Sequence, residues 1–219
     1  MYRNMEKAII FDMDGTLFKT ELILESALTR TLSRLDSDSI GYRENPIQKY
    51  NEIMGVPLEE VWRVLLVNPT TESINYANLI FQDSLIEDIK SGIGSLHDEL
   101  KEALDYLLTR GFKLYIASNG DTDYLKAIYD TYDLGKYFTD FFSINEVTTS
   151  SKSDLVAYII DKENIQIKYI VGDRLSDFQA TKDNGVKSIG CKFYFSKIEE
   201  LDTADHVIES LSQLKEIIE

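Results

Sequence analysis

The order of apolar and polar positions divides the chain into a strand-like start, a long helical stretch and an alternating remainder. Residues 7–11, Lys-Ala-Ile-Ile-Phe, form an almost continuous apolar run that stops at the acidic, glycine-containing sequence 12–16. A short run of this kind predicts a strand buried on both faces and followed by a turn. From about residue 20 to residue 90, apolar side chains recur at spacings of three and four, as from Leu24 to Leu28. This spacing is that of one face of a helix, so it predicts about four helices.

Proline and glycine positions predict where these helices begin and end. Asn45-Pro46 has the pattern of a helix cap followed by proline at the first helical position. Gly55 predicts a helix end, and Pro57 predicts the next start. Residues 90–95 place two glycines in a polar stretch, where the backbone can pivot, and they predict a return linker.

Strand-like and helix-like segments alternate beyond residue 95. The expected strands are 113–117, 141–144, 168–171, 186–189 and 206–208, and the expected helices are 98–110, 123–132, 153–163, 176–184 and 210–218. Strands joined through helices predict a parallel sheet that is covered on both faces. We therefore expect an α/β fold: a doubly wound, mostly parallel, Rossmann-like core from residues 1–18 and 92–219. A helical cap, residues 19–91, is inserted after the first strand.

Composition narrows the class of protein. Of the 219 residues, 43% are hydrophobic and 28% charged, as in globular proteins, and the net charge of −15 would repel nucleic acid and anionic membranes. With the single cysteine Cys191, and with only His97 and His206 as imidazole ligands, neither an intramolecular disulfide nor a structural zinc site is expected. No apolar run reaches the roughly 20 residues of a membrane span or resembles a signal segment. We expect a cytoplasmic protein.

Polar residues follow several of the expected strands. In open α/β sheets, ligands bind beyond the carboxyl ends of the strands. Those positions hold residues 12–16, the segment 118–120 and the segment 172–177, and Lys152 is expected in a polar loop just before a helix. The Ser118 hydroxyl and the backbone N–H groups around Asn119 are candidate donors to phosphate oxygens.

Four aspartates converge on this expected edge. Asp12 and Asp14 are two residues apart in extended chain, so their side chains project to one side. Two like charges ~4 Å apart at an effective dielectric of ~20 repel by about 4 kcal/mol. Asp173 and Asp177 add further negative charge. A hard cation such as Mg²⁺, bound by carboxylates, water and substrate phosphate, offsets this repulsion together with Lys152, and the set predicts a phosphoryl-transfer site.

These residues resemble, in the same order, the four sequence motifs of the haloacid dehalogenase superfamily. The matching residues are Asp12-x-Asp14-Gly15-Thr16, Ser118, Lys152 and Gly172-Asp173-x-x-x-Asp177. The resemblance spans residues 7–177, and the helical insertion is similar to the cap of the phosphoglycolate phosphatase and β-phosphoglucomutase branch. Two positions depart from that branch: Lys19, where an acidic residue is frequent, and Ser153, where a proline often follows the motif lysine.

The resemblance implies a role for each site residue. Asp12 is expected to be the nucleophile that becomes an aspartyl-phosphate, and Asp14 the acid and base that protonates the leaving oxygen and then activates water. Thr16 is expected to position Asp14. The expected phosphate-binding residues are Ser118, Asn119 and Lys152, and the expected Mg²⁺ ligands are Asp12, the Asp14 carbonyl, Asp173 and, in the metal shell, Asp177.

The predicted function is therefore a Mg²⁺-dependent phosphatase, a phosphoric monoester hydrolase that acts on a small phosphorylated metabolite. A phosphomutase that uses the same site is the first alternative, because the fate of the phosphoryl group depends on how the cap closes. A dehalogenase is the second, although it would need neither Asp14 nor a metal. A non-enzymatic phospho-receiver is the third, although it would carry its acidic pair after the first strand and its acceptor on a later one.

Charged and aromatic residues outside the motifs receive structural roles. Arg174 is expected to form a salt bridge at the rim of the site rather than to bind phosphate. In the helical insertion, Arg43, Lys49, Trp62 and Arg63 could meet a substrate, but basic residues are outnumbered by acidic ones there. We expect these four side chains on helix surfaces.

Overall fold

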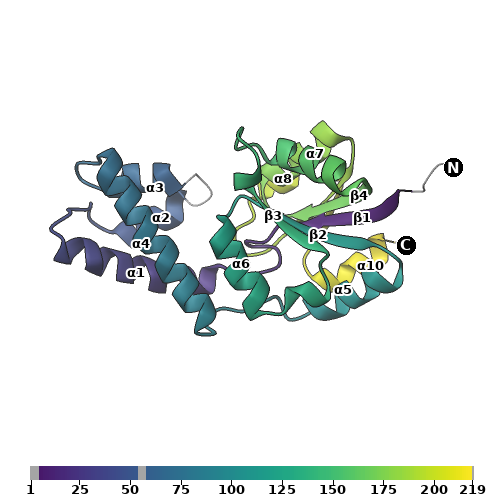
Figure 1. Ribbon diagram of the computed structural model, residues 1–219, viewed down its shortest axis with the longest axis horizontal. Coiled ribbons are helices and arrows are strands. Elements are labelled where there is room, and N and C mark those ends of the chain that lie inside the picture. The colour runs from purple at the N-terminus through teal and green to yellow at the C-terminus, as the bar shows by residue number, and fades with distance from the viewer. Residues whose placement is uncertain (1–4, 54–57, 219) are drawn as a thin grey trace. The chain divides into compact units, whose positions relative to one another are not determined.

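The computed structural model describes residues 5–53 and 58–218 (Figure 1). The chain divides into two compact units: residues up to Thr20 together with those from Ser95 onward, and residues Glu21–Gly94. We call them the core unit and the inserted unit. The glycines of the connecting segment have the positive φ values that favour glycine, +76° at Gly92 and +114° at Gly94.

The core unit is built on a six-stranded sheet in the order β3-β2-β1-β4-β5-β6, in which neighbouring strands are parallel. The strands are β1 Glu6–Phe11, β2 Lys113–Ser118, β3 Asp140–Ser143, β4 Ile165–Gly172, β5 Lys187–Cys191 and β6 His206–Ile208. The first strand lies at the centre, where Phe11 is paired with Ile116 of β2 and Val171 of β4. The predicted α/β fold with a parallel sheet is confirmed.

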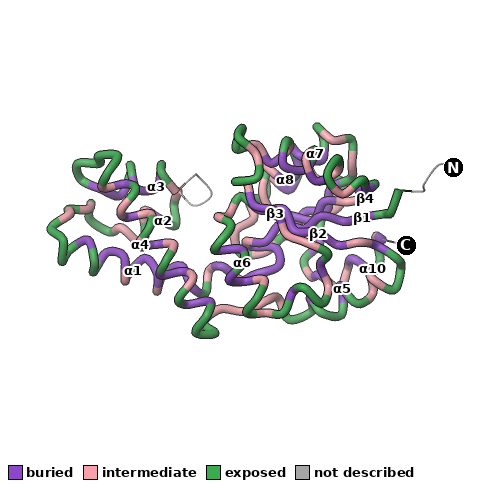
Figure 2. Tube along the Cα trace, viewed as in Figure 1, coloured by how far each residue is buried: buried purple, intermediate pink, exposed green. Residues whose placement is uncertain are grey.

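Helices cover both faces of this sheet, α7 and α8 on one face and α5 and α10 on the other (Figure 1). The helices of the core unit are α5 Leu100–Thr109, α6 Thr122–Thr131, α7 Lys152–Glu163, α8 Leu175–Asn184, α9 Ile198–Leu201 and α10 Leu214–Ile217. Short 3₁₀ turns lie at Leu134–Lys136, Ile144–Glu146 and Leu211–Gln213. Ala8 and Ile10 of β1 pack with Leu155 and Ile159 of α7, and the central strands β1 and β2 are buried along most of their length (Figure 2).

The inserted unit contains four helices within its described residues, as the spacing of its apolar residues predicts. They are α1 Glu21–Ser37, α2 Pro46–Ile53, α3 Leu58–Leu65 and α4 Thr71–Lys90. The helix start expected at Pro46 is confirmed, whereas Gly55 and Pro57 lie outside the described residues. The prediction that Trp62 lies on a helix surface is wrong, because its side chain is fully buried and packs edge-to-face on Phe81 at 5.6 Å between ring centroids.

Three segments of the core unit differ from the sequence prediction. β4 begins at Ile165 rather than Lys168, because residues 165–167 pair with Glu6–Ala8 ahead of an irregularity in the β1 register. The helix expected over 210–218 is a 3₁₀ turn followed by α10, and Ser210 caps this start through a capping box with Gln213. The one-turn helix α9 has too few residues to produce a periodic pattern.

No helix among residues 5–53 and 58–218 combines the length and the apolar character needed to cross a bilayer.

Candidate active site

The central strands bring the predicted site residues to the carboxyl edge of the sheet. Asp12 follows β1 directly, and its backbone N–H donates to the Val171 carbonyl of β4 at 2.8 Å. Ser118 is the last residue of β2, and Asp173 is the first residue after β4. Because these strands are neighbours and parallel, residues more than 100 positions apart in sequence meet at one edge.

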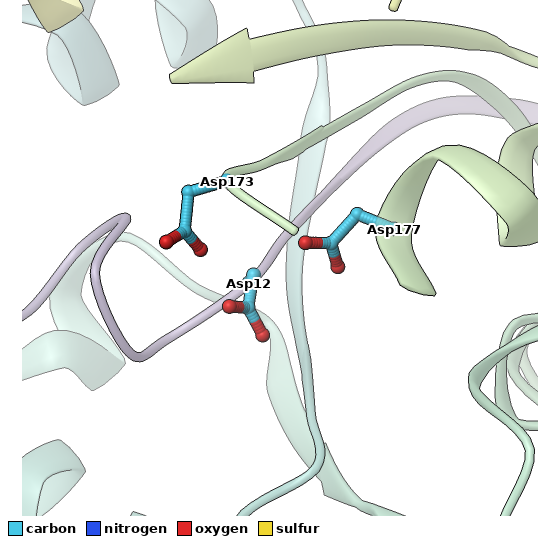
Figure 3. A group of neighbouring side chains, drawn as sticks. All are labelled: Asp12, Asp173 and Asp177. Carbon is cyan, nitrogen blue, oxygen red and sulfur yellow. The ribbon is translucent and has the colours of Figure 1, made fainter. Parts of the chain in front are cut away.

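Three carboxylates form the centre of this site. Asp12, Asp173 and Asp177 are all buried, and each offers an oxygen that lies within 4.8 Å of those of the other two (Figure 3). Asp12 and Asp173 come from strand ends, and Asp177 comes from the first turn of α8. The backbone N–H of Arg174 donates to Asp177 Oδ2 at 3.1 Å, which fixes this side chain at the helix start. The three aspartates predicted to bind metal through their carboxylates therefore meet in one place.

Lys152 is the cation that faces these carboxylates. Its Nζ lies 2.5 Å from Asp12 Oδ1 and also forms an ion pair with Asp177. The residue is 5% exposed and is the first of α7, whose N-cap is Ser151. The sequence prediction that Lys152 lies in a polar loop is wrong. The helix start extends one residue further because Ser151 accepts a hydrogen bond from the Asp154 backbone N–H.

Burial and like charge shift the pKa values of this cluster. Burial raises the pKa of Asp12 to about 7, since the attraction of Lys152 only partly offsets burial and the repulsion of Asp177 and Asp14. Burial also raises the pKa of Asp173 well above its usual value, and the charges of Asp12 and Asp177 raise it further. Burial alone would lower the pKa of Lys152, but the two carboxylates that face it raise this pKa instead. The site thus gathers more negative charge than one lysine offsets.

Asp14 lies beside these carboxylates, and one of its oxygens accepts hydrogen bonds from two hydroxyl groups. Thr20 Oγ1 donates to Asp14 Oδ1 at 2.7 Å, and the Tyr124 hydroxyl donates to the same oxygen at 2.5 Å. Burial raises the pKa of Asp14, against the lowering by hydrogen bonds from Tyr124, Thr20 and Ser118. The expectation that Thr16 positions Asp14 requires correction.

The hydroxyl of Thr16 donates to Asp173 Oδ1 at 3.4 Å, so Thr16 connects the first turn to β4. The cause is the path of the backbone after Asp12. The backbone N–H groups of Leu17 and Phe18 both donate to the Met13 carbonyl at 3.0 Å, which coils the chain and brings Thr20 next to Asp14. Thr20 and Tyr124 are site residues that the sequence interpretation missed.

The segment that follows β2 carries the expected phosphate donors. Ser118 is buried, and its Oγ accepts from the Gly120 backbone N–H at 3.0 Å. Ser143, at the end of β3, donates to the Gly120 carbonyl at 2.6 Å and fixes this segment to the neighbouring strand. Asn119 is exposed immediately after the strand. The phosphate-binding role of this segment stays a prediction.

Two glycines make room for the carboxylates. Gly15 has φ +72°, and a Cβ there would lie 2.6 Å from Asp173 Oδ2. A Cβ on Gly172 would overlap the carboxyl group of Asp177. Side chains at these two positions would displace the aspartates, so both glycines are required for the cluster to close.

Arg174 forms the predicted salt bridge at the rim. Its Nε lies 3.1 Å from Glu200 Oε2, and its second guanidinium nitrogen lies 3.3 Å from Oε1. Glu200 Oε2 also accepts from the Leu175 backbone N–H at 2.8 Å. Glu200 of α9 thus anchors the segment that carries Asp173, and Arg174 is engaged by a carboxylate.

Comparison with known proteins decides the family. A family model described as haloacid dehalogenase-like hydrolase matches residues 9–191. The chain belongs to the haloacid dehalogenase-like hydrolase family. The resemblance inferred from the four motifs is therefore confirmed, and the match includes Asp12, Lys152 and Asp173 as well as the inserted unit.

Curated relatives and solved structures of this family match almost the whole chain. A phosphoglycolate phosphatase of Vibrio parahaemolyticus is 25% identical, over 97% of this chain and 96% of its own length. A 5'-nucleotidase of Pseudomonas aeruginosa is 23% identical, over 96% and 95%. The crystal structure of a predicted phosphoglycolate phosphatase from Haemophilus somnus has a TM-score of 0.79 at 18% identity, covering 98% of both chains. The interpretation as a phosphoric monoester hydrolase agrees with these relatives.

Proposed function

We propose that the chain is a Mg²⁺-dependent phosphatase that hydrolyses a small phosphorylated metabolite through an aspartyl-phosphate on Asp12. The observation that carries this proposal is the buried group of Asp12, Asp173 and Asp177 around one lysine. Membership of a hydrolase family and relatives named as phosphatases support it.

The donor set fits a divalent cation. All three groups are hard carboxylate oxygens, and Mg²⁺ prefers a few such ligands together with water and phosphate oxygens. Asp173 Oδ2 is buried and has no hydrogen-bond partner among the described residues, which is costly for a carboxylate unless another group contacts it. Asp12, Asp173 and Asp177 would hold the ion, and the Asp14 carbonyl is the further ligand expected from the motif. Bound there, Mg²⁺ would screen the negative charges of nucleophile and phosphate from each other.

The chain's own residues account for the remaining steps. Lys152 holds Asp12 in place and offsets charge on the phosphoryl group, while the Ser118 hydroxyl donates to its oxygens. An Asp12 oxygen attacks phosphorus as the bond to the leaving oxygen breaks, and Asp14 gives that oxygen a proton. Asp14, now ionised, takes a proton from the water that hydrolyses the aspartyl-phosphate. The chain is thereby returned to its initial protonation state.

The residues around Asp14 favour a reaction at phosphorus over a carbon–halogen displacement. Halide leaves without a proton, so a dehalogenase has no use for an acid at residue 14. Here burial raises the pKa of Asp14, as an acid requires, and Asp173 and Asp177 supply cation ligands. We therefore place phosphate ester hydrolysis ahead of dehalogenation.

The experiment that tests the proposal compares Asp12→Asn with a matched variant, Asp205→Asn. Asp205 accepts hydrogen bonds from the Ser188 backbone N–H and hydroxyl at 2.8 Å and lies outside the cluster. Phosphate release from 4-nitrophenyl phosphate is measured with Mg²⁺ and with EDTA. We expect Mg²⁺-dependent turnover in the wild type and in Asp205→Asn, and none in Asp12→Asn. Turnover that survives in Asp12→Asn, or that is insensitive to EDTA, contradicts the proposal.

A further inference from the structure

Two hydroxyl groups converge on a single oxygen of Asp14. The Tyr124 hydroxyl lies 2.5 Å and Thr20 Oγ1 lies 2.7 Å from Asp14 Oδ1. Thr20 Oγ1 is also 3.4 Å from the Phe18 carbonyl, so the carboxylate is the nearer acceptor. A carboxylate oxygen has about two acceptor positions, and these two donors fill those of Oδ1.

The fold holds the Tyr124 hydroxyl in this position. Tyr124 lies in the first turn of α6, which begins four residues after β2, the neighbour of β1. The residue is 6% exposed, and its Cδ1 would lie 3.1 Å from a Cβ placed on Gly120. The ring thus packs closely against the segment that follows Ser118. A side chain at residue 120 would require the ring to shift by a few tenths of an ångström.

We infer that Tyr124, together with Thr20, is a positioning residue for the acid–base step, and that it makes Asp14 Oδ2 the oxygen that carries the proton. This inference rests on the proposed function, because it assigns a task within that reaction. While both hydroxyls donate to Oδ1, as they do here, a protonated Asp14 bears its hydrogen on Oδ2, because a hydrogen on Oδ1 would require one hydroxyl to turn and accept. Tyr124 does not touch the substrate in this assignment.

The proton balance of the step follows. As the P–O bond breaks, its electron pair goes to the leaving oxygen, which takes the proton from Asp14 Oδ2. The O–H electron pair stays on the Asp14 carboxylate, and the two hydroxyl donors stabilise the negative charge that forms there. Loss of the Tyr124 hydroxyl opens one acceptor position on Oδ1. The proton can then reside on the wrong oxygen, and the charge formed is less well stabilised.

The test is Tyr124→Phe, with Tyr129→Phe as the matched control. Tyr129 lies on the same helix, and its hydroxyl donates to the Phe138 carbonyl at 3.0 Å, away from Asp14. The value of kcat/KM, which covers the steps up to the aspartyl-phosphate, is measured for 4-nitrophenyl phosphate and for glycerol phosphate. The nitrophenolate leaves without protonation, whereas an alkoxide requires a proton.

We expect Tyr124→Phe to lower kcat/KM for glycerol phosphate by about tenfold to hundredfold, as for a lost hydrogen bond to a charged group. The same variant should lower kcat/KM for 4-nitrophenyl phosphate by much less, and Tyr129→Phe should change neither value. Equal losses on both substrates, or a loss no larger than that of Tyr129→Phe, overturn the inference.

A second variant covers the case in which Tyr124→Phe does not fold. Thr20→Val removes the other donor to Oδ1 at similar side-chain volume, and Thr20→Ser restores a hydroxyl. Thr20→Val should show the same dependence on the leaving group, and Thr20→Ser should recover most of the loss. A wild type that turns over neither substrate refutes the proposed function itself, whereas an active wild type with leaving-group-independent variants refutes only the role of Tyr124.

Discussion

Replacement of Lys152 by Met removes the ammonium group that pairs with Asp12 and Asp177 while keeping an apolar stem of similar length. The Lys152 side chain is 3% exposed, and its two partners are 8% and 1% exposed. Removal of one partner from a buried ion pair costs about 3–5 kcal/mol, because the remaining charges stay buried without compensation. We expect a loss of this size in the free energy of unfolding of the metal-free protein at about pH 8.

The size of this loss should depend on pH in a defined direction. Burial raises the pKa of Asp12 to about 7 even with Lys152 present, and removal of the lysine takes away its opposing effect. In the variant the pKa of Asp12 therefore lies above 7, and protonation of this carboxyl group relieves the uncompensated charge, so the loss of unfolding free energy should be largest in alkaline solution and should shrink as the pH falls toward and through about 7. The variant should therefore regain part of its lost unfolding free energy at lower pH, whereas a loss caused only by poorer packing would be the same at every pH.

The assay is urea unfolding followed by circular dichroism at two pH values, in the presence of EDTA. Lys192→Met is the control, since Lys192 pairs with Glu209 at 2.7 Å but both side chains are at least half exposed. Loss of an exposed pair costs about 0–1 kcal/mol. A Lys152→Met loss no larger than that of Lys192→Met, or one that does not decrease in acid, would refute the reasoning about the cluster.

Three further predictions concern Mg²⁺ binding, the turn at Gly15 and the phosphate-binding role of Ser118. Because the pKa of Asp12 is raised to about 7 in the folded protein, Asp12 keeps its proton there at pH values where the unfolded chain has released it. The stability that this bound proton contributes is therefore lost as the pH rises from about 4 to 7. The increase in Tm on adding Mg²⁺ should therefore be larger near pH 8 than near pH 5.5, and an equal increase at both would contradict this. Gly15→Ala should lower the free energy of unfolding by about 1–3 kcal/mol more than Gly111→Ala does. Both glycines have positive φ, but only a Cβ at residue 15 would contact Asp173. Equal losses in urea unfolding would show that this contact with Asp173 has no cost. Ser118→Ala should raise KM for 4-nitrophenyl phosphate by about tenfold, the worth of one charge-assisted hydrogen bond, and an unchanged KM would remove Ser118 from phosphate binding.

The sequence predicts the sheet and the three carboxylates well because both depend on local patterns. Continuous apolar runs mark strands that are buried on both faces, and the parallel arrangement then brings every strand end to one edge. Asp12 and Asp173 are placed by that argument alone. Gly15 and Gly172 add to it, since the close approach of the aspartates leaves no room for a Cβ at either position.

The sequence does not predict the directions of individual side chains or the contacts between residues far apart in the chain. The sequence motif suggests Thr16 as the partner of Asp14, and only the path of the backbone around the Met13 carbonyl shows that Thr20 takes this place. The contact between Tyr124 and Asp14 joins residues 110 positions apart, and no periodicity encodes it. Trp62 is similar, because its burial depends on Phe81 of another helix.

The carboxylate of Asp12 takes up the phosphoryl group in the proposed reaction, and direct detection of that group on the protein is the most decisive measurement. The wild type is mixed with 4-nitrophenyl phosphate and Mg²⁺, quenched in acid within one turnover, digested and analysed by mass spectrometry. We expect a phosphoryl group on the peptide that contains Asp12, and we expect it to be absent when EDTA is added before the substrate. A phosphoryl group on a different residue, or turnover with no phosphorylated peptide at any quench time, would show that Asp12 is not the nucleophile.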